Sequence, residues 1–177
     1  YIEEKYKVKV IAVPGDISDI KTTEELHKQC INEYGKIDIL VNNCGGPPPK
    51  SYREINEDEW YKYFELLLMS SIRMTKLATP CMVEQKWGRI ITIGSTIMRE
   101  PTSKMVLSAT LRAATATFMK SISNELAEFN ITVNTISTGG VKTGRLISLF
   151  EESAKSEGIG LNESLERAAN SIPIKRF

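Results

Sequence analysis

Short apolar segments alternate with long helical patterns along this chain, and this alternation limits the folds that the chain can adopt. The segments predicted as strands are 7–13 (KVKVIAV), 39–41 (ILV), 89–94 (RIITIG) and 131–137 (ITVNTIS). Helical patterns cover 22–34, 56–82 and 103–128, with one or two short helices in 143–177. Strands that alternate with helices of this length form βαβ units, and apolar runs are typical of strands covered on both faces. The pattern predicts an α/β fold: a doubly wound parallel sheet, Rossmann-like, in a single domain over 1–177.

Polar residues at the helix ends predict where the helices begin and stop. Thr22 with Glu25 forms a capping-box pattern at the first long helix, and Gly35 is expected to close that helix. Asn56 with Glu59 three positions later predicts the start of the second long helix. In the tail, Asn162 is a candidate cap.

The charge and the cysteine and histidine content exclude several classes of function. A formal charge of +1 over 177 residues gives no electrostatic reason to expect binding to nucleic acid or to an anionic membrane. Cys30, Cys44 and Cys81 are odd in number and far apart, which argues against a disulfide framework or a zinc site and favours a reducing, cytoplasmic setting. His27 is the only histidine and lies in a helical pattern, so a Ser-His-Asp triad is not expected, and no metal site is predicted.

The stretch ILVNNCGGPPPK at 39–50 is the strongest local signal for a ligand site. In open parallel sheets, ligands bind beyond the carboxyl ends of the strands. Here a strand ends on Asn42 and Asn43, and Gly45 and Gly46 would let a polar ligand approach the backbone. The prolines at 47–49 should keep the following loop extended. The alternative interpretation is a stiff surface loop without a ligand.

Four motifs, in order and spacing, resemble the short-chain dehydrogenase/reductase family over nearly the whole chain: GDISD at 15–19, GKIDILVNNCGG at 35–46, WGRIITIGS at 87–95 and ITVNTISTGG at 131–140. They are most similar to the 3-oxoacyl-carrier-protein reductase and sugar dehydrogenase branches. The resemblance implies hydride transfer between NAD or NADP and a small-molecule carbonyl or secondary alcohol, without a metal. It also implies a homodimer or homotetramer built on the helices at 56–82 and 103–128.

The resemblance also implies roles for individual residues. Asp16 and Ile17 would lie beside the adenine of the cofactor, while Asn43 would face its ribose above Gly45. Ser95, after the third predicted strand, would bind the substrate oxygen. The loop 138–143 would hold the nicotinamide end through residues including Val141 and Thr143, although a threonine replaces the proline of the family there. Asn42 is expected to tie neighbouring strand ends together.

The catalytic positions of the family are only partly kept. Ser108 stands where the family has its acid/base tyrosine, Arg112 stands in place of the lysine, and Leu67 replaces the relay asparagine. An aliphatic hydroxyl is a much weaker acid than a phenol, and arginine is not equivalent to lysine, although Arg112 could still bind the nicotinamide ribose. Tyr52 is a candidate replacement phenol, with an exposed or packed loop aromatic as the alternative. The predicted catalytic residues are Ser95, Ser108 and Arg112, and the alternative function is a dinucleotide-binding or scaffold homologue with little or no activity.

Two further expectations concern segments outside these motifs. The glycine-rich phosphate turn of the family is not found, so the sequence is expected to be an internal portion of a longer protein, with 7–13 separated from 39–41 by a gap about two strands wide. The run Gly139-x4-Gly144 after a strand has the context of a phosphate-binding loop. Arg145-Leu146 replaces the Lys-Ser/Thr of that motif, which argues against a nucleotide hydrolase.

Overall fold

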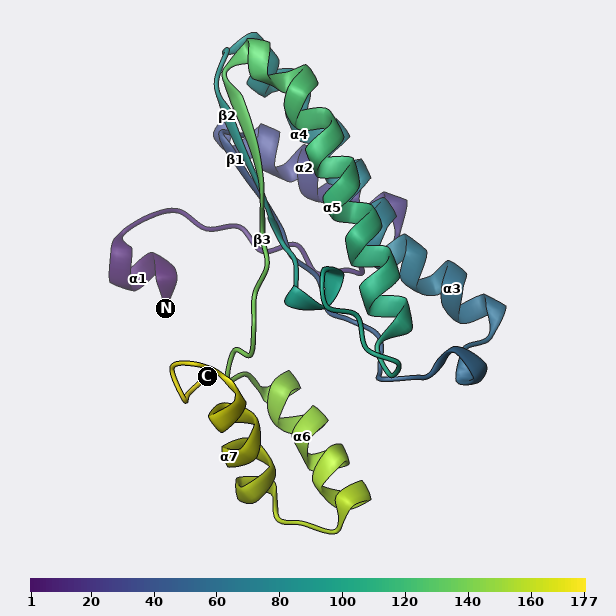
Figure 1. Cartoon of the computed structure of the whole chain (residues 1–177). Helices are drawn as coiled ribbons and strands as arrows, with labels where there is room; N and C mark the ends of the chain where they lie inside the picture. The colour runs from purple at the N-terminus through teal and green to yellow at the C-terminus, as the bar shows by residue number, and fades with distance from the viewer. The chain divides into compact units, whose positions relative to one another are not determined.

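Three parallel strands form the sheet: β1 (Ile39–Asn42), β2 (Gly88–Ile93) and β3 (Ile131–Ile136), in the order β1-β2-β3 (Figure 1). Asn42 pairs with Thr92 and Thr92 pairs with Thr135, so all three strands end at one edge. The computed structural model describes residues 1–177 as two compact units, Tyr1–Ser137 and Thr138–Phe177, and the sheet belongs to the first. The predicted α/β class with a parallel sheet is confirmed.

The helices of the first unit are α1 (Ile2–Tyr6), α2 (Ile20–Tyr34), α3 (Glu57–Phe64), α4 (Ser70–Glu84) and α5 (Val106–Leu126). A π-helical turn, Glu65–Met69, joins α3 to α4, so the long helix expected at 56–82 is interrupted rather than regular. Short 3-10 turns occupy Tyr52–Glu54, Thr96–Met98 and Ala127–Phe129. No helix combines the length and the apolar character that crossing a lipid bilayer requires.

The main core lies between the sheet and α2, α4 and α5, which Figure 1 shows on the same side of the strands. Its buried residues are Ile37, Leu40, Ala78, Met82, Ile90, Met119, Leu126 and Ile131. The other face of the sheet is open within this unit, because Ile39, Val41 and Ile136 are 55%, 54% and 48% exposed. Helices were expected on both faces, whereas in the first unit they cover one.

The segment 7–13 is not a strand, and the prediction of a fourth strand is wrong. Val8 and Val10 are exposed, and the backbone of Lys9 is held instead by the hydroxyl of Tyr34, which donates to its carbonyl oxygen at 3.1 Å. A β-strand requires a neighbouring strand to accept its hydrogen bonds, and none lies beside this segment. Because 7–13 is not a strand, the gap of two strands expected between it and 39–41 stays a prediction.

The helix ends agree with the sequence at two positions and differ at two others. Gly35 ends α2 in the left-handed region with φ 77°, and Asn56 caps α3 with Glu59 in a complete capping box. Asp19 rather than Thr22 caps α2, because its carboxylate accepts from Lys21 N one turn earlier than expected. The cap position of the last helix is Gly160, so the prediction for Asn162 is wrong.

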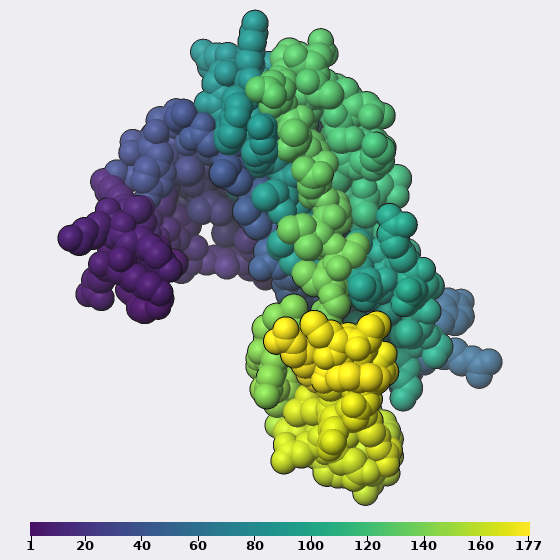
Figure 2. All heavy atoms as spheres, turned by 60° about the vertical axis from the view of Figure 1, so that its left-hand side comes forward, coloured from purple at the N-terminus to yellow at the C-terminus, as the bar shows by residue number.

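The second unit is a pair of helices, α6 (Gly144–Glu157) and α7 (Leu161–Ser171), whose side chains pack against one another (Figure 2). The rings of Phe150 and Phe177 lie 5.7 Å apart. Phe177 also lies against Gly140, where a Cβ atom would come within 2.5 Å of the ring. Gly140 is therefore needed for this close packing of the loop before α6.

Candidate active site

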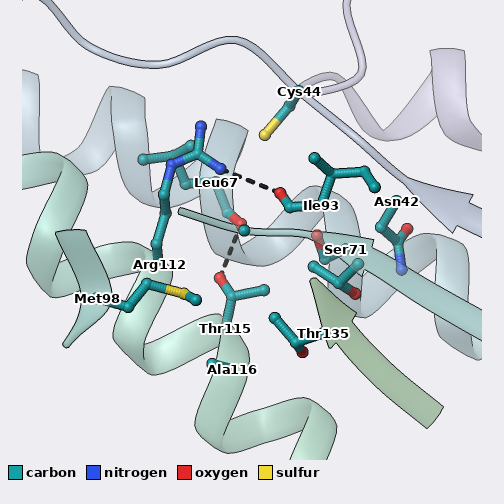
Figure 3. A pocket seen from close by; sticks show the side chains of 12 residues that line it. Asn42, Cys44, Leu67, Ser71, Ile93, Met98, Arg112, Thr115, Ala116 and Thr135 are labelled. Atoms are coloured by element: carbon teal, nitrogen blue, oxygen red, sulfur yellow. Dashed lines mark hydrogen bonds between the residues drawn. The ribbon is translucent and has the colours of Figure 1, made fainter. Parts of the chain in front are cut away.

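The carboxyl ends of the three strands meet the π turn and α5 around a small cavity of about 10 Å³ (Figure 3). Polar side chains from several elements line it: Asn42, Ser71, Thr92, Arg112, Thr115 and Thr135. A volume of this size admits at most one water molecule. The cavity is packing space at the strand ends, and a substrate would have to bind at the open edge outside it.

Arg112 on α5 connects the ends of β1 and β2. Its Nη1 donates to the carbonyl oxygen of Ile93 at 3.3 Å (Figure 3). Its Nη2 donates to the carbonyl oxygen of Gly45 at 3.2 Å. Ile93 is the last residue of β2, and Gly45 lies three residues after the end of β1. The guanidinium therefore fixes the spacing of the two loops that would face a ligand. A guanidinium group carries five N–H donors, so Arg112 has further donors beyond these two bonds.

The two serines of the predicted site lie in different settings. Ser95 follows β2, is half-buried, and its Oγ accepts from the backbone N–H of Ile97 at 3.4 Å. Its own hydroxyl hydrogen can still donate to a ligand oxygen. Ser108 lies one helical turn before Arg112 on α5 and is only 5% exposed. Ser95 is thus accessible at the strand edge, while Ser108 is part of the packed helix face.

Thr115 completes this face of α5 and was not singled out from the sequence. Its Oγ1 lies 2.9 Å from the carbonyl oxygen of Leu67, so it bonds the backbone of the π turn (Figure 3). The carbonyl oxygen of Leu111, one turn earlier on α5, lies at the same distance. Ser108, Arg112 and Thr115 follow one another at spacings of four and three residues. That spacing places residues on one side of a helix and was the available signal.

Cys44 lies beside Arg112 at the end of β1 and lines the cavity. Burial raises the pKa of the Cys44 thiol, and the positive charge of Arg112 opposes this shift without cancelling it. The thiol therefore stays protonated at neutral pH and is a poor nucleophile.

Asp16 begins a tight turn over 16–19, here called the Asp16 turn, in which Asp19 N donates to Asp16 O at 2.9 Å. The backbone N–H and the hydroxyl of Ser18 donate to Oδ1 of Asp16 at 2.9 and 2.8 Å. These bonds hold the pKa of the Asp16 carboxyl below its usual value. Ile17 is half-buried in the same turn. Gly15 packs against Thr22, because a Cβ atom there would lie 2.5 Å from its methyl group.

Of the asparagines and glycines at the end of β1, some are buried and hydrogen-bonded and others are exposed. Asn43 and Gly45 are exposed, and no atom lies within 4 Å of the position that a Cβ atom on Gly45 would occupy. Asn42 is buried, and its amide donates to Thr75 Oγ1 on α4 at 3.4 Å, so it ties β1 to a helix rather than to a neighbouring strand end. Lys50 N donates to Lys104 O at 2.8 Å, which joins the proline loop to the segment before α5.

The remaining predicted residues lie elsewhere. Tyr52 is 75% exposed and lines a separate surface hollow with Trp60 and Tyr61, as an exposed loop aromatic would. Val141 and Thr143 belong to the second unit, where Val141 is exposed and Thr143 caps α6 by accepting from Leu146 N at 3.3 Å. The structure thus brings together Gly45, Arg112 and the end of β2 that precedes Ser95.

Comparison with known proteins gives matches over most of the chain. The family described as short chain dehydrogenase matches residues 1–154. The NADPH-dependent reductase BacG of Bacillus subtilis is 31% identical over 167 residues, which cover 94% of this chain and 64% of that protein. The 3-oxoacyl-[acyl-carrier-protein] reductase FabG of Salmonella typhimurium is 31% identical over 137 residues, 77% of this chain and 56% of that protein.

A solved structure agrees with these sequence matches. L-sorbose reductase from Gluconobacter frateurii, complexed with NADPH and L-sorbose, superposes with a TM-score of 0.92 at 29% identity, over 99% of this chain and 67% of that one. The chain spans 64% of the length of BacG and 56% of that of FabG. The resemblance inferred from the four motifs is confirmed, and the chain belongs to the short chain dehydrogenase family.

Proposed function

We propose that the chain is part of an NAD(P)-dependent oxidoreductase that transfers a hydride between a nicotinamide cofactor and a carbonyl or secondary alcohol of 3-oxoacyl or sugar type. The observation that carries the proposal is the position of Ser95, half-buried at the carboxyl end of the central strand and next to the Ile93 carbonyl that Arg112 binds. Ligands of open parallel sheets bind at this edge. BacG and FabG are named as reductases, and L-sorbose reductase was solved with NADPH.

Two residues that the resemblance assigns to the cofactor are accessible at the open edge. Asn43 and Gly45 are exposed, and the space beside Gly45 is open. We propose that NAD or NADP binds with its adenine near Asp16 and Ile17, its ribose near Asn43 and Gly45, and its nicotinamide end near Arg112. Contacts of the nicotinamide end with Val141 and Thr143 are implied by the family resemblance alone. When bound, the nicotinamide would supply or accept the hydride.

The side chains of this chain would orient the substrate better than they would protonate it. The Ser95 hydroxyl would donate a hydrogen bond to the substrate oxygen, and Arg112 would hold the two strand-end loops in place. The buried Ser108 hydroxyl is far too weak an acid to replace a phenol. This observation favours a second candidate function, a dinucleotide-binding homologue with little or no turnover.

We further propose a homodimer or homotetramer that associates through the long helix containing α3 and α4 and through α5. Tyr61 and Phe64 on α3 are exposed, and apolar surface on a helix favours association. A cytoplasmic protein acting on a small molecule, with neither nucleic acid nor membrane as a partner, fits the charge of +1.

Fluorescence titration of the full-length protein with NADPH and with NADH tests the binding part of the proposal. Turnover assays on ketones, 3-oxoacyl thioesters and sugars then separate an enzyme from a binding protein. Binding without turnover would favour the second candidate, and binding of neither dinucleotide would contradict both.

The double substitution Ser108→Tyr with Arg112→Lys tests whether this pair limits catalysis. We expect turnover to rise at least about tenfold, because a phenol next to a cation is a competent proton donor at neutral pH. Cofactor affinity should be measured in parallel. Unchanged turnover on every substrate, with the cofactor still bound, would show that the proton donor lies elsewhere.

A further inference from the structure

Arg73 on α4 contacts two segments that are far apart in the sequence. Its Nη2 pairs with the carboxylate of Glu65 at 2.5 Å, and its Nη1 donates to the carbonyl oxygen of Ser18 at 3.0 Å. The Arg73 side chain is 16% exposed, so these are the contacts of a largely buried cation. Ser18 lies in the Asp16 turn, 55 positions before Arg73 in the sequence.

The π turn explains how Glu65 and Arg73 come to face each other. Residues eight apart in a regular α-helix point about 80° away from each other, whereas residues seven apart are nearly aligned. A π turn adds one residue without adding to the rotation about the helix axis. Two residues eight apart across a π turn therefore lie on the same side of the helix, as residues seven apart do in a regular α-helix. Glu65 is the first residue of this turn. The irregularity in the long helix therefore supplies Arg73 with its counter-ion.

Ser18 is the link between Arg73 and Asp16. Its carbonyl oxygen accepts from Arg73, while its N–H and its hydroxyl donate to Asp16. Holding the carbonyl fixes the peptide plane that follows Ser18, and the plane of a tight turn determines where the neighbouring side chains point. A continuous chain of contacts thus runs from Glu65 through Arg73 and Ser18 to Asp16.

We propose that Arg73 is a positioning residue for the adenine end of the cofactor site: anchored by Glu65, it fixes Ser18 and thereby the direction of Asp16. The inference rests on the proposed function, since it requires a dinucleotide with its adenine at the Asp16 turn. Its physical basis is preorganisation, because a turn that is already ordered loses less conformational freedom when the ligand binds. Arg73 itself need not touch the ligand.

Arg73→Met in the full-length protein tests the inference, with 5′-AMP and reduced nicotinamide mononucleotide as separate probes of the two ends of the site. We expect the affinities for 5′-AMP and for the dinucleotide to fall about fivefold to twentyfold, corresponding to roughly 1–2 kcal/mol. Affinity for the nicotinamide mononucleotide should change less than about twofold, and turnover at saturating cofactor should be unchanged. Lys76→Met is the matched control, since Lys76 is an exposed cation on the same helix and should leave every value unchanged.

Two further variants keep the test decisive if Arg73→Met does not fold. Arg73→Lys keeps the charge beside Glu65 but lacks the fork that reaches both partners, and it should give an intermediate loss for 5′-AMP. Glu65→Gln, at a partly exposed position, should lower the affinity for 5′-AMP about twofold to fivefold. An equal loss for both probes would show a general structural role and overturn the inference, as would an unchanged 5′-AMP affinity. Failure of the unsubstituted protein to bind any of these nucleotides would instead overturn the proposed function, and this inference with it.

Discussion

Arg112 stands where the family has a lysine, and its guanidinium group makes contacts within the protein itself. Its guanidinium bonds the carbonyl oxygens of Ile93 and Gly45, so it contributes to the stability of the strand edge. We expect Arg112→Met to lower the free energy of unfolding by about 1–3 kcal/mol, because the partly buried carbonyl of Ile93 and the exposed carbonyl of Gly45 lose a charged donor. Denaturant unfolding measures this. Lys120→Met, at an exposed position of the same helix, should be neutral, and equal stability of the two variants would contradict the prediction.

Thr92 and Thr115 allow one substitution to be compared in two settings. Thr92 Oγ1 is buried and has no hydrogen-bond partner among the protein atoms, whereas Thr115 Oγ1 lies within bonding distance of Leu67 O and Leu111 O. Thr92→Val should therefore stabilise the protein by about 1 kcal/mol, since it replaces a desolvated hydroxyl group by a methyl group of similar shape. Thr115→Val should destabilise it by about 1 kcal/mol. A destabilising Thr92→Val would mean that the hydroxyl is satisfied in solution.

Asp16 gives a prediction for pH. The Ser18 backbone bond, followed by the Ser18 hydroxyl, lowers the pKa of Asp16 from its ordinary value of 3.8. A carboxyl whose folded pKa is depressed contributes stability above pH 3.8, and this contribution is lost as the pH falls through the folded value. NMR titration of the carboxyl should give a midpoint below 3.8. Ser18→Ala should move the midpoint up toward that value, and a midpoint at or above 3.8 in the unsubstituted protein would refute the assignment.

The sequence predicts which residues of the candidate site follow the strands, because this depends only on their order in the chain. Parallel strands end at the same edge, so placing Asn43, Gly45 and Ser95 after strands was enough to locate them there. Thr92 could not be distinguished from other strand residues, because its missing partner depends on the neighbouring elements. The role of Arg73 depends on a contact across 55 positions of the sequence, which no local pattern shows.

Among the elements, the strands that have partners were predicted well and the unpartnered segment was not. The apolar runs at 39–41, 89–94 and 131–137 correspond closely to β1, β2 and β3. The run at 7–13 has equal β-propensity, yet it is not a strand. Propensity describes a fit to a half-buried pleated surface, and without a neighbouring strand that surface does not exist. The π turn was missed because its residues, ELLLM, are compatible with a regular helix.

Capping of α3 provides a test at the scale of the element. Asn56 Oδ1 accepts from Glu59 N at 2.9 Å, and the Glu59 carboxylate accepts from Asn56 N at 3.2 Å. Asn56→Ala should cost about 1 kcal/mol of stability because these end groups lose their partners. Asn162→Ala is the matched control, since Asn162 lies inside α7 and does not cap it. An equal cost at both positions in thermal unfolding would contradict the role assigned to Asn56.

For the molecule as a whole, the apolar pattern of the strands predicts more burial than the first unit provides. The run ILV of β1 was interpreted as covered on both faces, and Leu40 is indeed buried by the helices. Ile39 and Val41 point to the open face and are more than half exposed. A parallel sheet ordinarily has cover on both sides. Cover on both faces, which the apolar run predicted, is therefore found on only one face of β1 within the first unit.

Association of the full-length protein is the corresponding prediction for the whole molecule. Tyr61 and Phe64 present exposed aromatic surface on α3, at 62% and 38% of their areas, and burial of such surface stabilises an interface. Sedimentation velocity at micromolar concentration should show a dimer or tetramer, and the pair Tyr61→Glu with Phe64→Glu should shift the protein toward smaller species, because two charges would then be desolvated in the contact. Ile174→Glu, which changes an equally exposed apolar residue outside these helices, should leave the distribution unchanged. A single monomeric species in the unsubstituted protein would rule out association at this concentration, and equal effects of the two changes would place the interface elsewhere.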